Sequence, residues 1–77
     1  MGYKSRGAKV RVELIKGGTE VLVSGNRQGL HYLAEIFTGL AESEYDRHEP
    51  PHTHVEPALN SAEPESVPLE VLLKPDL

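Results

Sequence analysis

The sequence of 77 residues contains no cysteine, so neither a disulfide nor a thiolate-bound metal can stabilise its fold, and a reducing compartment is favoured. Its longest apolar runs, such as 21–23 and 71–73, have three residues, whereas a membrane span needs about 20. Residues 1–10 carry three basic side chains, but the apolar segment of a secretory signal does not follow them. We therefore expect a cytoplasmic protein that does not enter the membrane.

Catalytic motifs are also missing from the sequence. It has no Gly-x-Ser-x-Gly turn, no phosphate-binding glycine-rich loop and no His-Glu-x-x-His pair. Carboxylate pairs such as Glu42/Glu44 and Glu63/Glu65 lie in polar segments without an apolar pocket, which makes them poor general acids. We predict that the protein is not an enzyme.

The length of the chain predicts one domain, residues 1–77, near the lower limit for a fold held by its core alone. Residues 1–7 are predicted to be frayed, and residues 43–54 form a connector rich in proline and histidine. Packing must supply the stability, and a homodimer or a bound partner is left open as a further source.

Charge is unevenly divided between the two halves. Residues 1–40 contain six basic and three acidic side chains, whereas residues 41–77 contain two basic and nine acidic ones, for a net charge of −4. Without a basic patch, nucleic-acid binding is not expected. The acidic half is suited to a basic protein partner, and the alternative is a solvated surface that keeps the protein soluble.

The first half of the chain predicts a hairpin followed by a helix. Val10, Val12 and Leu14 alternate with polar residues, which indicates a strand over 9–16, and 20–24 is its return strand. Gly17-Gly18 suits the positive φ angles of a tight turn between them. A helix then begins at the N-cap Asn26 and ends near 42–44. In its first turn, Gly29 permits close approach to the sheet. Its predicted apolar stripe is Leu30, Leu33, Ala34, Phe37, Leu40 and Ala41.

The second half predicts two more strands. Extended structure is expected within 52–59, a turn or loop over 60–66, and a strand over 67–74 whose apolar face holds Val67, Leu69, Val71 and Leu73. The expected fold is α+β and two-layered, in the order ββαββ, with one helix packed on one face of a small, mostly antiparallel sheet. The other sheet face is mixed and carries Arg11, Glu13, Leu22, Glu70 and Leu72.

Three of the four histidines lie within seven residues, at His48, His52 and His54. In a strand, His52 and His54 point to one face and can share a Zn²⁺ or Ni²⁺ ion, with His48 or Glu49 as a third ligand. Pro50-Pro51 favours an extended segment that separates His48 from His52 by about 12 Å, so a turn must bring His48 back. The alternatives are an exposed rigid connector, and a pH-sensing cluster beside neighbouring carboxylates.

Two segments together resemble a known family. Ser24-Gly25-Asn26-Arg27-Gln28-Gly29-Leu30 leads into Leu33-Ala34-Glu35, and His52-Thr53-His54-Val55 precedes Glu65-Ser66-Val67-Pro68-Leu69-Glu70-Val71. This pattern is similar to immunity protein 32, a family of small bacterial immunity proteins from polymorphic toxin systems, over residues 20–74. The resemblance implies a hairpin, a helix and two further strands, and a protein that binds and neutralises a cognate toxin. Pro68 and the double proline before His52 depart from the family pattern.

The sequence thus supports two hypotheses. The first is a non-enzymatic protein-binding domain that neutralises a toxin and contacts it through Asp46, His48, Glu49, His52, His54 and Glu56. The second is a small metal-binding module with His48, His52 and His54 as ligands for Zn or Ni.

Overall fold

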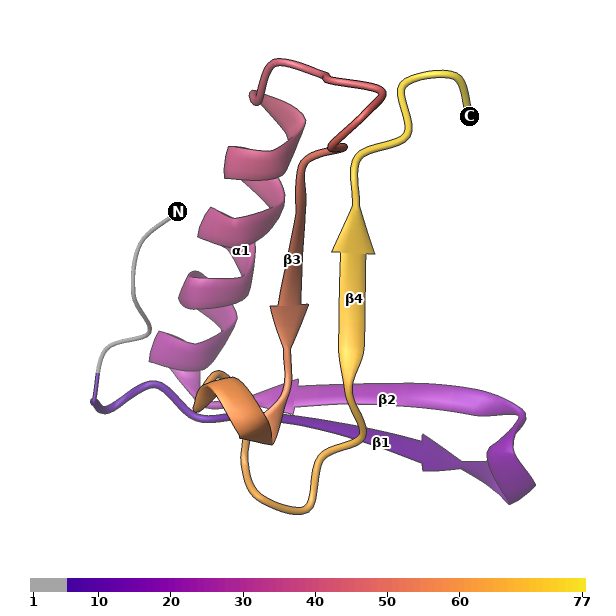
Figure 1. The fold of residues 1–77 in the computed structure, drawn as a ribbon. Coiled ribbons are helices and arrows are strands. Elements are labelled where there is room, and N and C mark those ends of the chain that lie inside the picture. The colour runs from indigo at the N-terminus through magenta and orange to yellow at the C-terminus, as the bar shows by residue number, and fades with distance from the viewer. Residues whose placement is uncertain (1–5) are drawn as a thin grey trace.

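The computed structural model describes residues 6–77. The elements follow one another in the predicted ββαββ order, which confirms it (Figure 1): β1 (Val10–Ile15), β2 (Glu20–Gly25), α1 (Arg27–Ala41), β3 (His52–Val55) and β4 (Leu69–Leu72), with short 3-10 turns at Lys16–Gly18 and Pro57–Leu59. Of the predicted frayed segment 1–7, residues 1–5 lie outside the described residues, whereas the Gly7 carbonyl accepts a hydrogen bond from Asn26 Nδ2 at 2.7 Å.

The strands form two separate sheets, so the prediction of one small sheet is wrong. Strand β1 pairs with β2, and β3 pairs with β4, both antiparallel. Figure 1 shows the β1–β2 hairpin running across one end of α1, β3 and β4. The helix therefore packs against two small sheets rather than on one face of a single sheet.

The second edge of β1 explains why the sheets stay separate. Val10 O accepts from Glu63 N at 2.8 Å, and Val12 O accepts from Val67 N at 2.9 Å. Between these bonds, the backbone N–H of Val12 is satisfied by the Ser66 hydroxyl at 3.1 Å rather than by backbone. Pro64 and Pro68 have no N–H to donate, so the segment 63–67 covers this edge without becoming a regular strand.

The hairpin turn has the predicted glycine conformation. Gly17 and Gly18 have φ angles of 68° and 87°, and Lys16 before them also has a positive φ of 53°. The connection thus contains one more left-handed residue than the Gly-Gly pattern predicts. The Thr19 hydroxyl donates to Lys16 O at 2.7 Å and helps to close this turn.

The predicted start of the helix is confirmed. The side chain of Asn26 caps α1 by accepting from Gly29 N at 2.7 Å, and the same oxygen accepts from Lys9 N at 3.0 Å. The expected close approach at Gly29 is also present, because a Cβ on this residue would lie 2.0 Å from Lys9 O. The chain thus crosses from β2 into α1 directly against the start of β1.

The core lies where α1 meets both sheets. Its buried members are Val10 and Val12 of β1, Leu33, Ile36 and Leu40 of α1, Val55 of β3, and Ala62, with Tyr32, Val67, Leu69 and Val71 packed against them. The predicted helix stripe is partly wrong, because Ile36 is buried while Leu30 and Phe37 remain half exposed. Two narrow sheets cover only the face that carries Leu33, Ile36 and Leu40, so the flanking apolar side chains stay open to solvent.

Candidate functional site

The connector between α1 and β3 carries half of the residues predicted to bind a partner. Asp46, His48 and Glu49 are all exposed. The Asp46 carboxylate accepts from His48 N at 2.9 Å, and its carbonyl accepts from Glu49 N at 3.2 Å, which makes a local turn. The turn orders the acidic connector without burying its side chains.

The outer face of the β3–β4 sheet gathers the remaining histidines. Successive residues of a strand point to opposite faces, and Val55, Leu69 and Val71 face the core. His52 and His54 therefore lie on the other face, with their rings 5.3 Å apart in an edge-to-face arrangement.

A carboxylate from the neighbouring strand joins the two histidines. Glu70 of β4 is paired in register with His54 of β3. One ligand atom from each of His52, His54 and Glu70 lies within 4.8 Å of the other two. Among the described residues this is the group placed to hold a metal ion, and His48 is not part of it.

Backbone contacts orient both imidazole rings. His52 Nδ1 lies 2.9 Å from Pro50 O, and a carbonyl only accepts, so Nδ1 carries the hydrogen and, in the neutral ring, Nε2 holds the lone pair. His54 Nδ1 lies 3.9 Å from the Glu56 carboxylate. The buried Ser61 hydroxyl accepts from Glu56 N at 2.9 Å and reaches His54 O at 3.1 Å, which fixes the end of β3.

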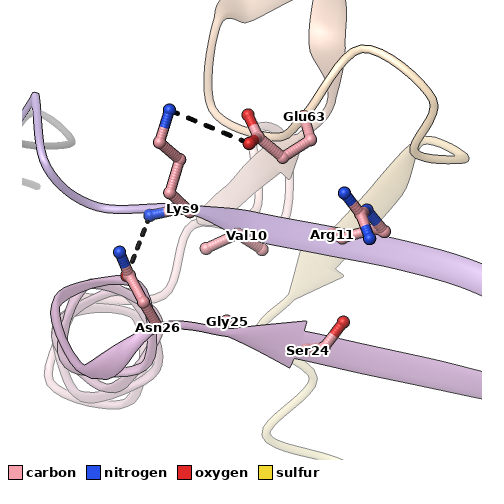
Figure 2. Close-up of a pocket in the computed structure, with 7 residues that line it drawn as sticks. All are labelled: Lys9, Val10, Arg11, Ser24, Gly25, Asn26 and Glu63. Atoms are coloured by element: carbon pink, nitrogen blue, oxygen red, sulfur yellow. Dashed lines mark hydrogen bonds and ion pairs between the residues drawn. The ribbon is translucent and has the colours of Figure 1, made fainter.

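A small cleft of about 230 Å³ opens where the hairpin begins, beside the first turn of α1. Figure 2 shows Lys9 between Asn26, which receives its backbone N–H, and Glu63, whose carboxylate lies 3.9 Å from Lys9 Nζ. These groups are already paired with one another, and they connect the start of β1, the start of α1 and the loop that carries Glu63. We interpret the cleft as a structural contact between these segments rather than as a binding site.

An apolar face extends from the helix onto the hairpin. We define it by Leu14, Val21, Val23, Leu30 and Phe37, which are between 40% and 56% exposed. Val23, Leu30 and Phe37, with Leu33, Ala34 and Leu69, line a groove of about 340 Å³. Leu14 and Val21 form a cross-strand pair nearer the hairpin tip, on the face that carries the buried Val12.

Sequence reasoning found His52 and His54 but did not find their partner Glu70. It placed Glu70 on the mixed face of the last strand, yet only the register of β3 against β4 brings it beside His54. The buried Ser61 and Ser66 were also missed, because no local pattern distinguishes them from other serines of the loop.

These observations define a small α+β protein with exposed apolar, acidic and histidine-bearing surfaces. No helix in residues 6–77 has the length and apolar character to cross a membrane. The sequence matches immunity protein 32 over residues 20–74, from the start of β2 to just beyond β4. The chain therefore belongs to the immunity protein 32 family, and the predicted resemblance is confirmed. Comparisons with curated proteins and with solved structures found no match.

Proposed function

We propose that this protein neutralises a cognate toxin by binding to it, without catalysis of its own. Membership of the immunity protein 32 family, over 55 of the 77 residues, is the observation that carries this proposal. The matched segment contains β2, α1, β3 and β4. It therefore includes most of the apolar face and the whole acidic connector between α1 and β3, residues 42–51.

The apolar face is the anchor of the proposed contact. Contiguous exposed apolar side chains of this kind mark binding surfaces in small soluble proteins. Phe37 is the largest of them and is 49% exposed, so covering its open half removes about 100 Å² from water. That burial contributes about 2 kcal/mol, or roughly thirtyfold in affinity.

The acidic connector supplies the electrostatic part of the proposed contact. Glu42, Glu44, Asp46 and Glu49 follow one another closely after the end of α1, all with exposed side chains. Such a cluster increases the rate at which a basic toxin surface associates, and it does so mainly at low salt. Of the four other predicted contact residues, His48 lies in the connector, and His52, His54 and Glu56 lie on or just after β3. All six contacts stay predictions.

The test is co-expression with a candidate toxin domain, chosen from the genes that neighbour this protein's own. Wild-type protein is expected to restore growth and to form a one-to-one complex with the purified toxin domain. Phe37→Ser is expected to weaken the complex by at least tenfold, measured by calorimetry. Leu59→Ser is the matched control, because Leu59 is 59% exposed but does not line the groove.

Two results would contradict the proposal. The first is a toxin that remains active in the presence of an excess of folded wild-type protein. The second is a toxin that is chemically modified or cleaved by sub-stoichiometric protein, because this would show catalysis rather than binding. Circular dichroism of each variant establishes that a lost complex does not reflect an unfolded chain.

A further inference from the structure

We propose that His52, His54 and Glu70 form a zinc site that links β3 to β4. Their ligand atoms lie within 4.8 Å of one another. In a tetrahedral zinc site with bonds of about 2.1 Å, neighbouring ligand atoms are roughly 3.4 Å apart. Small side-chain rotations close this difference, because His52 and Glu70 are exposed and His54 is only half buried.

The imidazole of His52 is already oriented for metal binding. Its Nδ1–H donates to Pro50 O at 2.9 Å, which directs the lone pair of Nε2 away from that carbonyl. Metal-binding histidines commonly donate their second nitrogen to a carbonyl or carboxylate in this way. The ring of Pro50 fixes its own φ angle, so the sequence Pro50-Pro51-His52 holds the acceptor in place.

Glu70 is available as the third ligand. None of the lysine, arginine or histidine side chains of residues 6–77 forms an ion pair with its carboxylate. Two imidazoles and one carboxylate are a ligand set that Zn²⁺ accepts, and they leave a fourth position for water or for a group from another molecule. The Glu56 carboxylate, 3.9 Å from His54 Nδ1, is placed to hold the second ring from outside the site.

A zinc ion at this position would join the two strands of a sheet that has no third strand. His54 and Glu70 are cross-strand partners, and His52 lies one pair further along. The three ligands meet only when β3 and β4 are paired, so the ion binds the folded chain in preference to the unfolded one. At a free Zn²⁺ concentration of about 100 times Kd, the melting temperature is expected to rise by roughly 10–20 °C.

The experiment is a calorimetric titration of the full chain, without a histidine tag and after treatment with a chelator, with ZnCl2. Wild-type protein is expected to bind one ion per chain with a Kd of 10 μM or tighter. His52→Ala and Glu70→Gln are each expected to weaken binding at least tenfold. His48→Ala and His31→Ala are matched controls that retain it, because these histidines lie in the connector and on α1.

Three outcomes would overturn the site: a Kd weaker than 10 μM, binding that survives Glu70→Gln, and binding that His48→Ala removes. NMR spectra of the imidazole and strand amide groups check that the variants remain folded. The titration uses this chain alone, so its result does not depend on the proposed toxin. Conversely, failure to neutralise a toxin would contradict the proposed function and would not count against the zinc site.

Discussion

The two ends of the β1–β2 hairpin are built very differently. At its base, Lys9, just before β1, is bonded to Asn26 at the start of α1, and β1 itself is bonded to the segment 63–67. Toward its tip, Leu14 and Val21 are more than half exposed although they lie on the same face as the buried Val12. The same strand pair thus connects the other segments of the fold at one end and exposes an apolar surface at the other.

This difference indicates how a small chain divides its sequence between stability and contact. At the base, backbone hydrogen bonds join Lys9 to the start of α1 and β1 to the segment 63–67. The close approach of α1 is possible because Gly29 has no Cβ to meet Lys9 O. The tip and the helix flank leave apolar area uncovered, which costs stability in the isolated protein and would be recovered if the proposed toxin covers it. Substitutions at the base should therefore affect folding, and substitutions on the apolar face should affect binding.

The largest effect is expected for Gly29→Ala at the base. A Cβ would lie 2.0 Å from the carbonyl oxygen of Lys9, so β1 or α1 must move. Overpacking against backbone should lower the free energy of unfolding by about 3 kcal/mol or more, measured by urea denaturation. Gly39→Ala in the same helix is the control, and helix propensity predicts that it raises stability by about 0.5–1 kcal/mol. Equal stability of the two variants would refute the close contact.

Asn26→Ala should have the next largest effect. It removes the helix cap and the bonds to Lys9 N and Gly7 O, and a loss of about 2–3 kcal/mol is expected. Asn26→Asp keeps the accepting oxygen but places a second acceptor against Gly7 O, so it should cost less than the Ala variant, about 1–2 kcal/mol. Thermal unfolding followed by circular dichroism separates the two, and an Asp variant as unstable as the Ala variant would argue against the cap.

The same substitution at two positions of the hairpin sharpens the comparison. Val12→Thr places a hydroxyl where the side chain is 1% exposed and should cost about 2 kcal/mol. Val21→Thr, at 55% exposure, should change stability by no more than about 0.5 kcal/mol. Denaturant titrations of both variants test this, and a large loss at Val21 would mean that the tip contributes to folding.

The smallest effect is expected at alkaline pH. Burial raises the pKa of Tyr32 above its ordinary value of 10.0, because the fold disfavours the phenolate. As the pH rises, Tyr32 therefore ionises first in the unfolded chain. The contribution of Tyr32 to the free energy of unfolding is complete below pH 10 and is lost as the pH rises through the raised pKa. Tyr32→Phe should flatten the fall in melting temperature above pH 10, while Tyr45→Phe in the exposed connector serves as the control.

Local patterns were sufficient for the elements of the fold. The alternation around Val10 and Val12 predicted β1, the Gly-Gly pair predicted the turn, and Asn26 predicted the start of α1. Each of these signals acts over a few residues, through backbone angles or one side-chain cap, so neighbouring sequence suffices to determine it. The family resemblance used the same short segments.

The arrangement of the elements required long-range contacts. The pattern of apolar residues on α1 did not reveal that Ile36 is buried and Phe37 half exposed, because this depends on the width of the sheets that meet the helix. Histidines two apart on a strand indicated a shared face, but Glu70 entered the cluster through the register of another strand.

The sequence by itself determined the order of the strands and the helix, the helix cap at Asn26 and the family to which the chain belongs. Only the tertiary structure decided that the strands form two sheets, which apolar residues stay open and which carboxylate faces the histidines. The reason is physical: caps and turns depend on neighbours along the chain, whereas sheet pairing and burial depend on which distant segments compete for the same surface.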